Sequence, residues 1–132
     1  MAFSTDIRFI RQAEAALGVV FPAALTARLR CDNGGELDVL DADWRLHPVF
    51  DDSDARRAKR TASHIVQETM AARAWPGFPA QAIAIATDGD GNQLVLLPAA
   101  EGTALLAAVH VWWHEDGELE RVAASCADLQ DL

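Results

Sequence analysis

The sequence predicts an α+β fold, with a single domain over residues 1–132 and a mostly antiparallel central sheet flanked by helices. A length of 132 residues suits one domain. Segments with helical spacing of apolar residues alternate with short apolar runs bounded by turn residues. The clearest of these is Ile83–Leu97, where two apolar runs flank an Asp- and Gly-rich core, the pattern of a β-hairpin. Its second run, Leu94–Leu97, is apolar throughout, which predicts a strand covered on both faces at the centre of the sheet.

Two helices are expected before the first strand. Apolar residues at successive helical turns predict an amphipathic helix over Asp6–Leu17, followed by a glycine that stops it. Proline is favoured at the first position of a helix. Because Leu25 and Leu29 lie one turn apart, the second helix is expected from Pro22 to about Cys31.

The other elements follow from runs of apolar residues and from the turn residues between them. Asp51-Asp52-Ser53-Asp54 offers cap acceptors and negative charge at a helix start, and a mostly apolar side continues to about Arg73. One long helix is therefore expected there. Before and after it, the sequence predicts strands at Leu37–Leu40, Trp44–Val49, Val109–Trp113 and Leu119–Val122, and a short helix at Ala124–Leu132.

The charge balance limits the partners. The chain carries 20 acidic residues against 11 basic ones, a net charge of −9, which argues against nucleic acid as a direct ligand because phosphate binding needs a basic surface. Such an excess can steer a cationic protein, or it can serve solubility alone. No apolar run approaches the roughly 20 residues of a membrane helix, and the first residues lack a signal-peptide layout. The expected compartment is the cytoplasm, without membrane contact.

No metal or cofactor is expected. Asp88–Asn92 copies the opening of a calcium loop, but Gln93 and Ala99 stand where that loop needs a glycine and a bidentate acid, so a plain hairpin turn is the better interpretation. His110 and His114 are four residues apart, which is about 13 Å along a strand and too far for one shared zinc.

No catalytic residues are predicted. The chain has no G-x-S-x-G elbow, and neither Cys31 nor Cys126 adjoins a histidine, so both are expected to be reduced, packed thiols. Catalytic groups that are distant in sequence can come together in the folded protein, so a small hydrolase stays an alternative. One basic cluster is either a solvated helix face balanced by nearby acids or a contact for phosphate or an acidic peptide: Arg56, Arg57, Lys59 and Arg60.

Tryptophan is the better indication of a binding surface, since interfaces favour it. Trp112 and Trp113 are adjacent in a predicted strand, so their side chains point to opposite faces of the sheet. One is expected in the core, and the other is either covered by a helix or exposed as an aromatic anchor.

Three blocks of the sequence together resemble the SUKH superfamily, the bacterial immunity proteins related to the fungal Smi/Knr-type cell-wall regulators. The chain departs from the family pattern at Asn92, Leu25 and Cys126, where relatives usually have Asp, an aromatic residue nearby and Phe. The blocks are Ile10…Glu14…Leu17-Gly18…Phe21-Pro22…Leu25…Leu29…Asn33-Gly34-Gly35, then Ile85-Ala86…Asp88-Gly89…Gly91-Asn92…Leu94-Val95-Leu96, then Val109…Trp112…His114-Glu115…Val122-Ala123…Ser125.

This resemblance implies a SUKH-like, non-enzymatic protein-binding domain. The leading interpretation is an immunity protein that neutralises a cognate bacterial toxin by stoichiometric occlusion, with a basic toxin domain as its partner. The alternatives are a regulatory or scaffold domain that binds a host protein or peptide and, less well supported, a small hydrolase. The residues expected to contact the partner are five acids that steer it and two tryptophan anchors: Asp88, Asp90, Glu115, Asp116, Glu118, Trp44 and Trp112.

Overall fold

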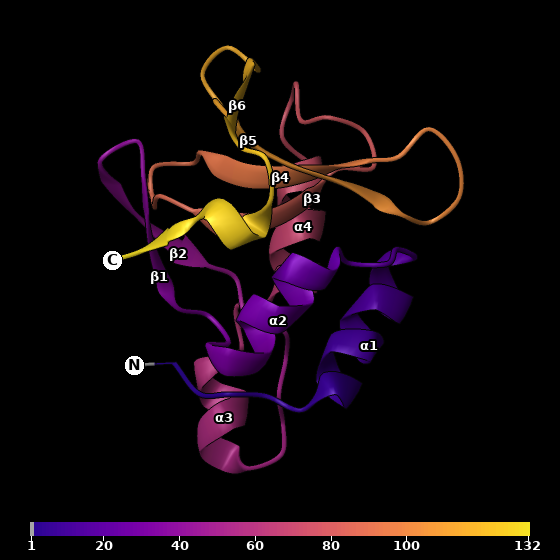
Figure 1. The fold of residues 1–132 in the computed structure, drawn as a ribbon, viewed down its shortest axis with the longest axis vertical. Helices are drawn as coiled ribbons and strands as arrows, with labels where there is room; N and C mark the ends of the chain where they lie inside the picture. Colours follow the sequence, from indigo (N-terminus) through magenta and orange to yellow (C-terminus); the bar gives the residue numbers. More distant parts are fainter. Residues whose placement is uncertain (1) are drawn as a thin grey trace.

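A computed structural model describes residues 2–132, and Figure 1 shows its arrangement. The helices within these residues are α1 (Ile7–Leu17), α2 (Ala23–Cys31), α3 (Ala55–Arg60), α4 (Ile65–Arg73) and the 3₁₀ turn η1 (Cys126–Asp128). The strands are β1 (Glu36–Val39), β2 (Ala42–Leu46), β3 (Ile83–Thr87), β4 (Gln93–Pro98), β5 (Leu105–Trp112), β6 (Leu119–Ala123) and β7 (Gln130–Asp131).

All seven strands of this region lie in one sheet, in the order β6-β5-β4-β3-β2-β1-β7. Every neighbouring pair is antiparallel. The first six strands form a meander, and β7 returns to the far edge to pair with β1. The predicted α+β class with an antiparallel sheet is confirmed.

The predicted hairpin forms the middle of the sheet, as β3 and β4. Ile83, Leu94 and Leu96 are fully buried in the main core. Helices α1 and α2, which lie side by side in Figure 1, contribute Ile10 and Leu25 to that core. A smaller apolar cluster contains Ala82, Val95 and Trp112, with Phe78 packed against it.

The long helix expected over residues 51–73 is wrong: the chain forms α3 and α4 with a break between them. The Thr61 hydroxyl accepts a hydrogen bond from the Asp51 backbone N–H at 2.9 Å and lies 2.9 Å from the Arg57 carbonyl oxygen, its acceptor. The first N–H of α4, at Ile65, donates to Pro48 O at 2.7 Å, and the His64 side chain caps the helix by accepting from Gln67 N. Local side-chain bonds of this kind compete with helix continuation.

The helix expected over Ala124–Leu132 is also wrong. This segment forms only η1 and then β7. Arg28 of α2 holds it in place, donating to Cys126 O at 3.3 Å and to Leu129 O at 2.6 Å, while Leu129 is buried in the core. A short strand that pairs with the free edge of β1 satisfies more of the backbone than an isolated final helical turn would.

The second predicted strand ends early, at Leu46 instead of Val49. The Asn33 side-chain amide forms hydrogen bonds with both backbone groups of Val49. It accepts from the Val49 N–H at 2.8 Å and donates to the Val49 carbonyl at 3.0 Å, so neither group is available to a neighbouring strand. β2 pairs only with the last residues of β3, and the preceding part of that edge is covered by α4. There, Thr69 Oγ1 accepts from Ala84 N at 3.1 Å and lies 3.3 Å from Ala84 O.

Candidate functional site

Three hairpin turns lie at the same end of the sheet. Strands β2 and β3 are antiparallel, and Arg45 of β2 pairs with Thr87 at the end of β3. The start of β2 and the end of β3 therefore lie at the same end of the sheet, so the β1–β2 and β3–β4 turns project in the same direction. Gln93 at the start of β4 faces Trp112 at the end of β5, which brings the β5–β6 turn to that end as well. We call the surface formed by residues 40–41, 88–92 and 113–118, with Trp75 beside them, the tip surface.

The tip surface carries all five acids expected to contact a partner. Two of them shape their own turns: Asp88 accepts from Asp90 N at 2.8 Å and from the Asn92 side-chain amide at 2.8 Å, and Asp116 accepts from Glu118 N at 3.0 Å. The other three are exposed and their carboxylates form no hydrogen bond or ion pair with any part of residues 2–132: Asp90, Glu115 and Glu118.

The β3–β4 and β5–β6 turns are joined by two polar contacts between Asn92 and His114. Asn92 Oδ1 accepts from the His114 backbone N–H at 3.0 Å and lies 2.7 Å from His114 Nδ1. Gly91, with φ +99°, lies against this imidazole, since a Cβ there would be 3.1 Å from Nδ1. The two acidic turns are therefore held as one unit.

Trp75 is the exposed aromatic residue of this surface, with 54% of its surface accessible. Its ring meets the His114 imidazole edge-on at 6.0 Å. The loop that carries it is fixed, because Trp75 N donates to Ala72 O at 3.0 Å and the Trp112 indole N–H donates to Gly77 O at 3.1 Å. Trp75 is not among the residues predicted to contact a partner, although its Pro- and Gly-containing context, Trp75–Pro79, marks a surface loop.

The two tryptophans expected as anchors are buried instead, which corrects that part of the predicted contact set. Trp44 is 3% exposed in the main core, and Trp112 is 1% exposed beneath Phe78, whose ring meets it edge-on at 5.1 Å. Neither offers a surface to a partner in this conformation. The prediction that Trp112 and Trp113 point to opposite faces is confirmed, since Trp113 packs against the main core and Trp112 lies in the smaller cluster.

A small cavity of about 80 Å³ lies between α4 and the tip surface. Its walls include Glu68, Ala71, Trp75, Gly91 and Gln93. Beside it, the His47 ring Nε2 lies 3.0 Å from Gln93 Oε1. Burial lowers the pKa of His47 despite this hydrogen bond and the nearby Glu68 charge, so the ring is neutral at pH 7.

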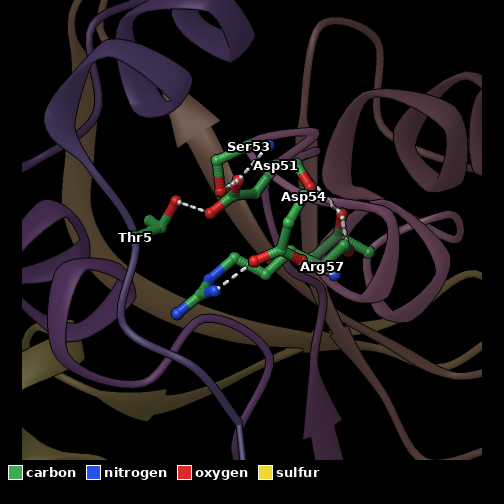
Figure 2. Close-up of polar contacts among 6 residues, drawn as sticks. Thr5, Asp51, Ser53, Asp54 and Arg57 are labelled. Carbon is green, nitrogen blue, oxygen red and sulfur yellow. Dashed lines mark hydrogen bonds and ion pairs between the residues drawn. The ribbon is translucent and has the colours of Figure 1, made fainter.

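A second, larger groove of about 750 Å³ runs beside α3. On its wall, Asp51 is 3% exposed and accepts from the Thr5 hydroxyl at 2.7 Å and the Ser53 hydroxyl at 2.6 Å; Figure 2 shows these two side chains directed at the carboxylate. Burial acts to raise the pKa of Asp51, but the hydrogen bonds from Ser53 and Thr5 and the Arg57 charge lower it below its usual value.

Three members of the basic cluster predicted from the sequence line this groove, Arg57, Lys59 and Arg60. Arg57 forms an ion pair with Asp54 at 2.5 Å, also drawn in Figure 2. The guanidinium groups of Arg56, Arg57 and Arg60 lie 4.4 to 5.5 Å from the centre of the Phe3 ring. Cation–π contacts of this kind fasten the N-terminal segment to α3, so the cluster serves the fold.

The two cysteines form no disulfide, and Cys31 is exposed, which corrects the expectation that both are packed. Burial raises the pKa of the Cys126 thiol to about 11, against a small opposing effect of Arg28, so this thiol stays protonated and is a poor nucleophile. Among residues 2–132, no group of three or more His, Cys, Asp and Glu side chains is arranged to hold a metal ion.

Comparison with protein families matches residues 6–131 to the SMI1 / KNR4 family (SUKH-1). The chain belongs to this family, as its sequence blocks predicted. The SUKH family is known for immunity proteins, and these bind toxin proteins. A search of curated proteins finds no match. Within residues 2–132, no helix combines the length and the apolar character that crossing a membrane requires.

Proposed function

We propose that this protein is an immunity protein of the cytoplasm that neutralises a cognate toxin by binding it stoichiometrically, without catalysis and without a cofactor. The observation that carries the proposal is the tip surface. Three acids on two joined turns have no partner among residues 2–132, and an exposed tryptophan lies beside them. Unpaired charge with a fixed aromatic residue is the composition expected of a protein-binding surface.

The mechanism follows from the arrangement. Carboxylates that are not paired within the protein attract a basic protein over about 10 Å at ordinary ionic strength, and this attraction raises the rate of association. Trp75 then supplies apolar contact area at low entropic cost, because its loop is already held by the Trp112–Gly77 hydrogen bond. When a basic toxin domain binds at the tip surface, the bound immunity protein blocks the toxin's access to its target. Nucleic acid is a poor occupant of such an acidic surface.

The proposal is tested with the toxin encoded next to this protein's gene. Co-expression is expected to rescue cells that the toxin otherwise kills. Reversal of three charges, Glu115→Lys, Asp116→Lys and Glu118→Lys, is expected to slow association by about tenfold at low salt and to reduce its salt dependence. Stopped-flow or surface plasmon resonance measurements give both quantities.

The matched control is Glu101→Lys, which changes an exposed acid in the β4–β5 loop at the other end of the sheet. Its association rate is expected to stay within twofold of the wild type. Unchanged kinetics in the triple variant, with its thermal unfolding intact, would remove the tip surface from the proposal. Failure of rescue together with binding to a host regulatory protein would instead support the scaffold alternative.

A further inference from the structure

The cavity beside Trp75 has the size of one side chain. Its volume is about 80 Å³. Pockets for metabolites and cofactors are several times larger, at about 300 to 1,000 Å³. The cavity therefore suits a group that a partner protein inserts, and not a free ligand of ordinary size.

Its walls combine apolar groups with one polar side chain and one acid. Ala71, Ala72, Trp75 and Trp112 supply the apolar part, and Gln93 supplies the polar side chain. Glu68 of α4 supplies the charge. Glu68 as a residue is half-buried, and its carboxylate forms no hydrogen bond or ion pair anywhere in residues 2–132.

Nearby bases do not neutralise this carboxylate. His47 is neutral for the reason given above, and burial also lowers the pKa of His64, although the Glu68 charge opposes this. Arg73 of the same helix is turned to Ala82 O, at 3.3 Å, and to the Met70 sulfur, at 3.8 Å. Glu68 is thus a half-buried residue whose negative charge has no ion-pair partner in the described part of the chain.

We propose that this cavity receives a lysine or arginine side chain of the bound partner, with its aliphatic part on Trp75 and Ala71 and its cationic end at Glu68. Long cationic side chains combine an apolar stem with a charged head, which matches these walls, and tryptophan is the strongest aromatic partner for a cation. The inference rests on the proposed function, because it names the group of the partner that the tip surface recognises.

The test uses small probes in place of the partner: the Nα-acetyl methylamides of lysine, arginine and norleucine. Each is titrated into ¹⁵N-labelled protein while the Trp75 indole cross-peak, assigned by its loss in Trp75→Phe, is followed. The lysine or the arginine probe is expected to shift this peak saturably, with a Kd at least fivefold lower than that of norleucine. Glu68→Gln is expected to remove that preference, and Glu101→Gln is expected to preserve it.

Equal shifts with norleucine, no shift with either cation, or an unchanged preference in Glu68→Gln would each overturn the inference. Glu68→Gln replaces a half-buried carboxylate with a side chain of the same shape, so its amide spectrum serves as the check of the fold. The proposed function fails separately: a cation-selective pocket without rescue from the toxin refutes it, whereas rescue without cation selectivity refutes only the pocket.

Discussion

The groove beside α3 and the tip surface are both rich in charged side chains, but they use them differently. In the groove, Asp54 pairs with Arg57, and Asp51 accepts from Thr5 and Ser53. At the tip surface, Asp90 and Glu115 make no such contact within residues 2–132. Figure 1 places α3 and the β5–β6 turn at opposite ends of the molecule.

This difference separates charges that stabilise the fold from charges that are available to a partner. A buried carboxylate that satisfies several donors cannot be removed without leaving those donors unpaired. An exposed carboxylate without contacts adds nothing to stability, and in a chain with a net charge of −9 it adds repulsion. The larger groove is therefore the weaker candidate for the binding site.

The largest expected effect is that of Asp51→Ala. The change leaves the buried Thr5 hydroxyl and the Ser53 donors without their acceptor, so we expect a loss of about 3 kcal/mol in the free energy of unfolding. The matched tip-surface variant, Asp90→Ala, is expected to change it by less than about 0.5 kcal/mol. Urea unfolding at pH 7 compares the two. Equal losses would show that the two regions do not differ in the way described.

A smaller effect is expected inside the tip surface, from two glycines of one turn. Gly89→Ala meets nothing within 4 Å, so only its positive φ of +86° opposes the change, which we expect to cost about 1 kcal/mol. Gly91→Ala adds a Cβ at 3.1 Å from the His114 ring, which Asn92 holds in place; we expect about 2 kcal/mol. Equal losses, measured by thermal unfolding, would mean that the contact between the turns is easily displaced.

The most gradual effect is the pH dependence near the cavity. The pKa of His47 is lowered below 6.5 by burial, so below pH 6.5 the unfolded chain binds a proton that the folded protein does not. Stability is therefore expected to fall as the pH drops from 6.5 toward the folded pKa. His47→Gln should flatten the slope of the free energy of unfolding between pH 7.5 and 5.5, leaving a part due to His64, whose pKa is also lowered. An unchanged slope in this variant contradicts the assignment.

The sequence predicted those elements that depend on local pattern. The hairpin over Ile83–Leu97 and the first two helices depend on apolar spacing and on turn residues, and they form as expected. The two wrong helices fail for tertiary reasons. The Thr61 hydroxyl, at the end of α3, accepts from the Asp51 backbone N–H, and Arg28 of α2 binds the backbone carbonyls of Cys126 and Leu129. Both contacts join residues too far apart in sequence to be predicted from the spacing of apolar residues.

The candidate site shows the same limit. The five acids were found because turn residues mark exposed positions, but their convergence depends on strand register, which joins Asn92 to His114 across two hairpins. The tryptophans were ranked wrongly because strand alternation says which face a side chain takes and not what covers it. Phe78 covers Trp112, while Trp75, in a loop, stays exposed.

The return of β7 to β1 has a consequence for the association of this protein with other chains. Arg28 and Asp131, 103 residues apart, form an ion pair at 2.6 Å, and β7 covers the edge of β1. Without β7, that edge of β1 would present unpaired backbone groups, and open edges invite pairing with other chains. Two residues of β7, held by one arginine of α2, therefore protect the sheet against edge-to-edge association.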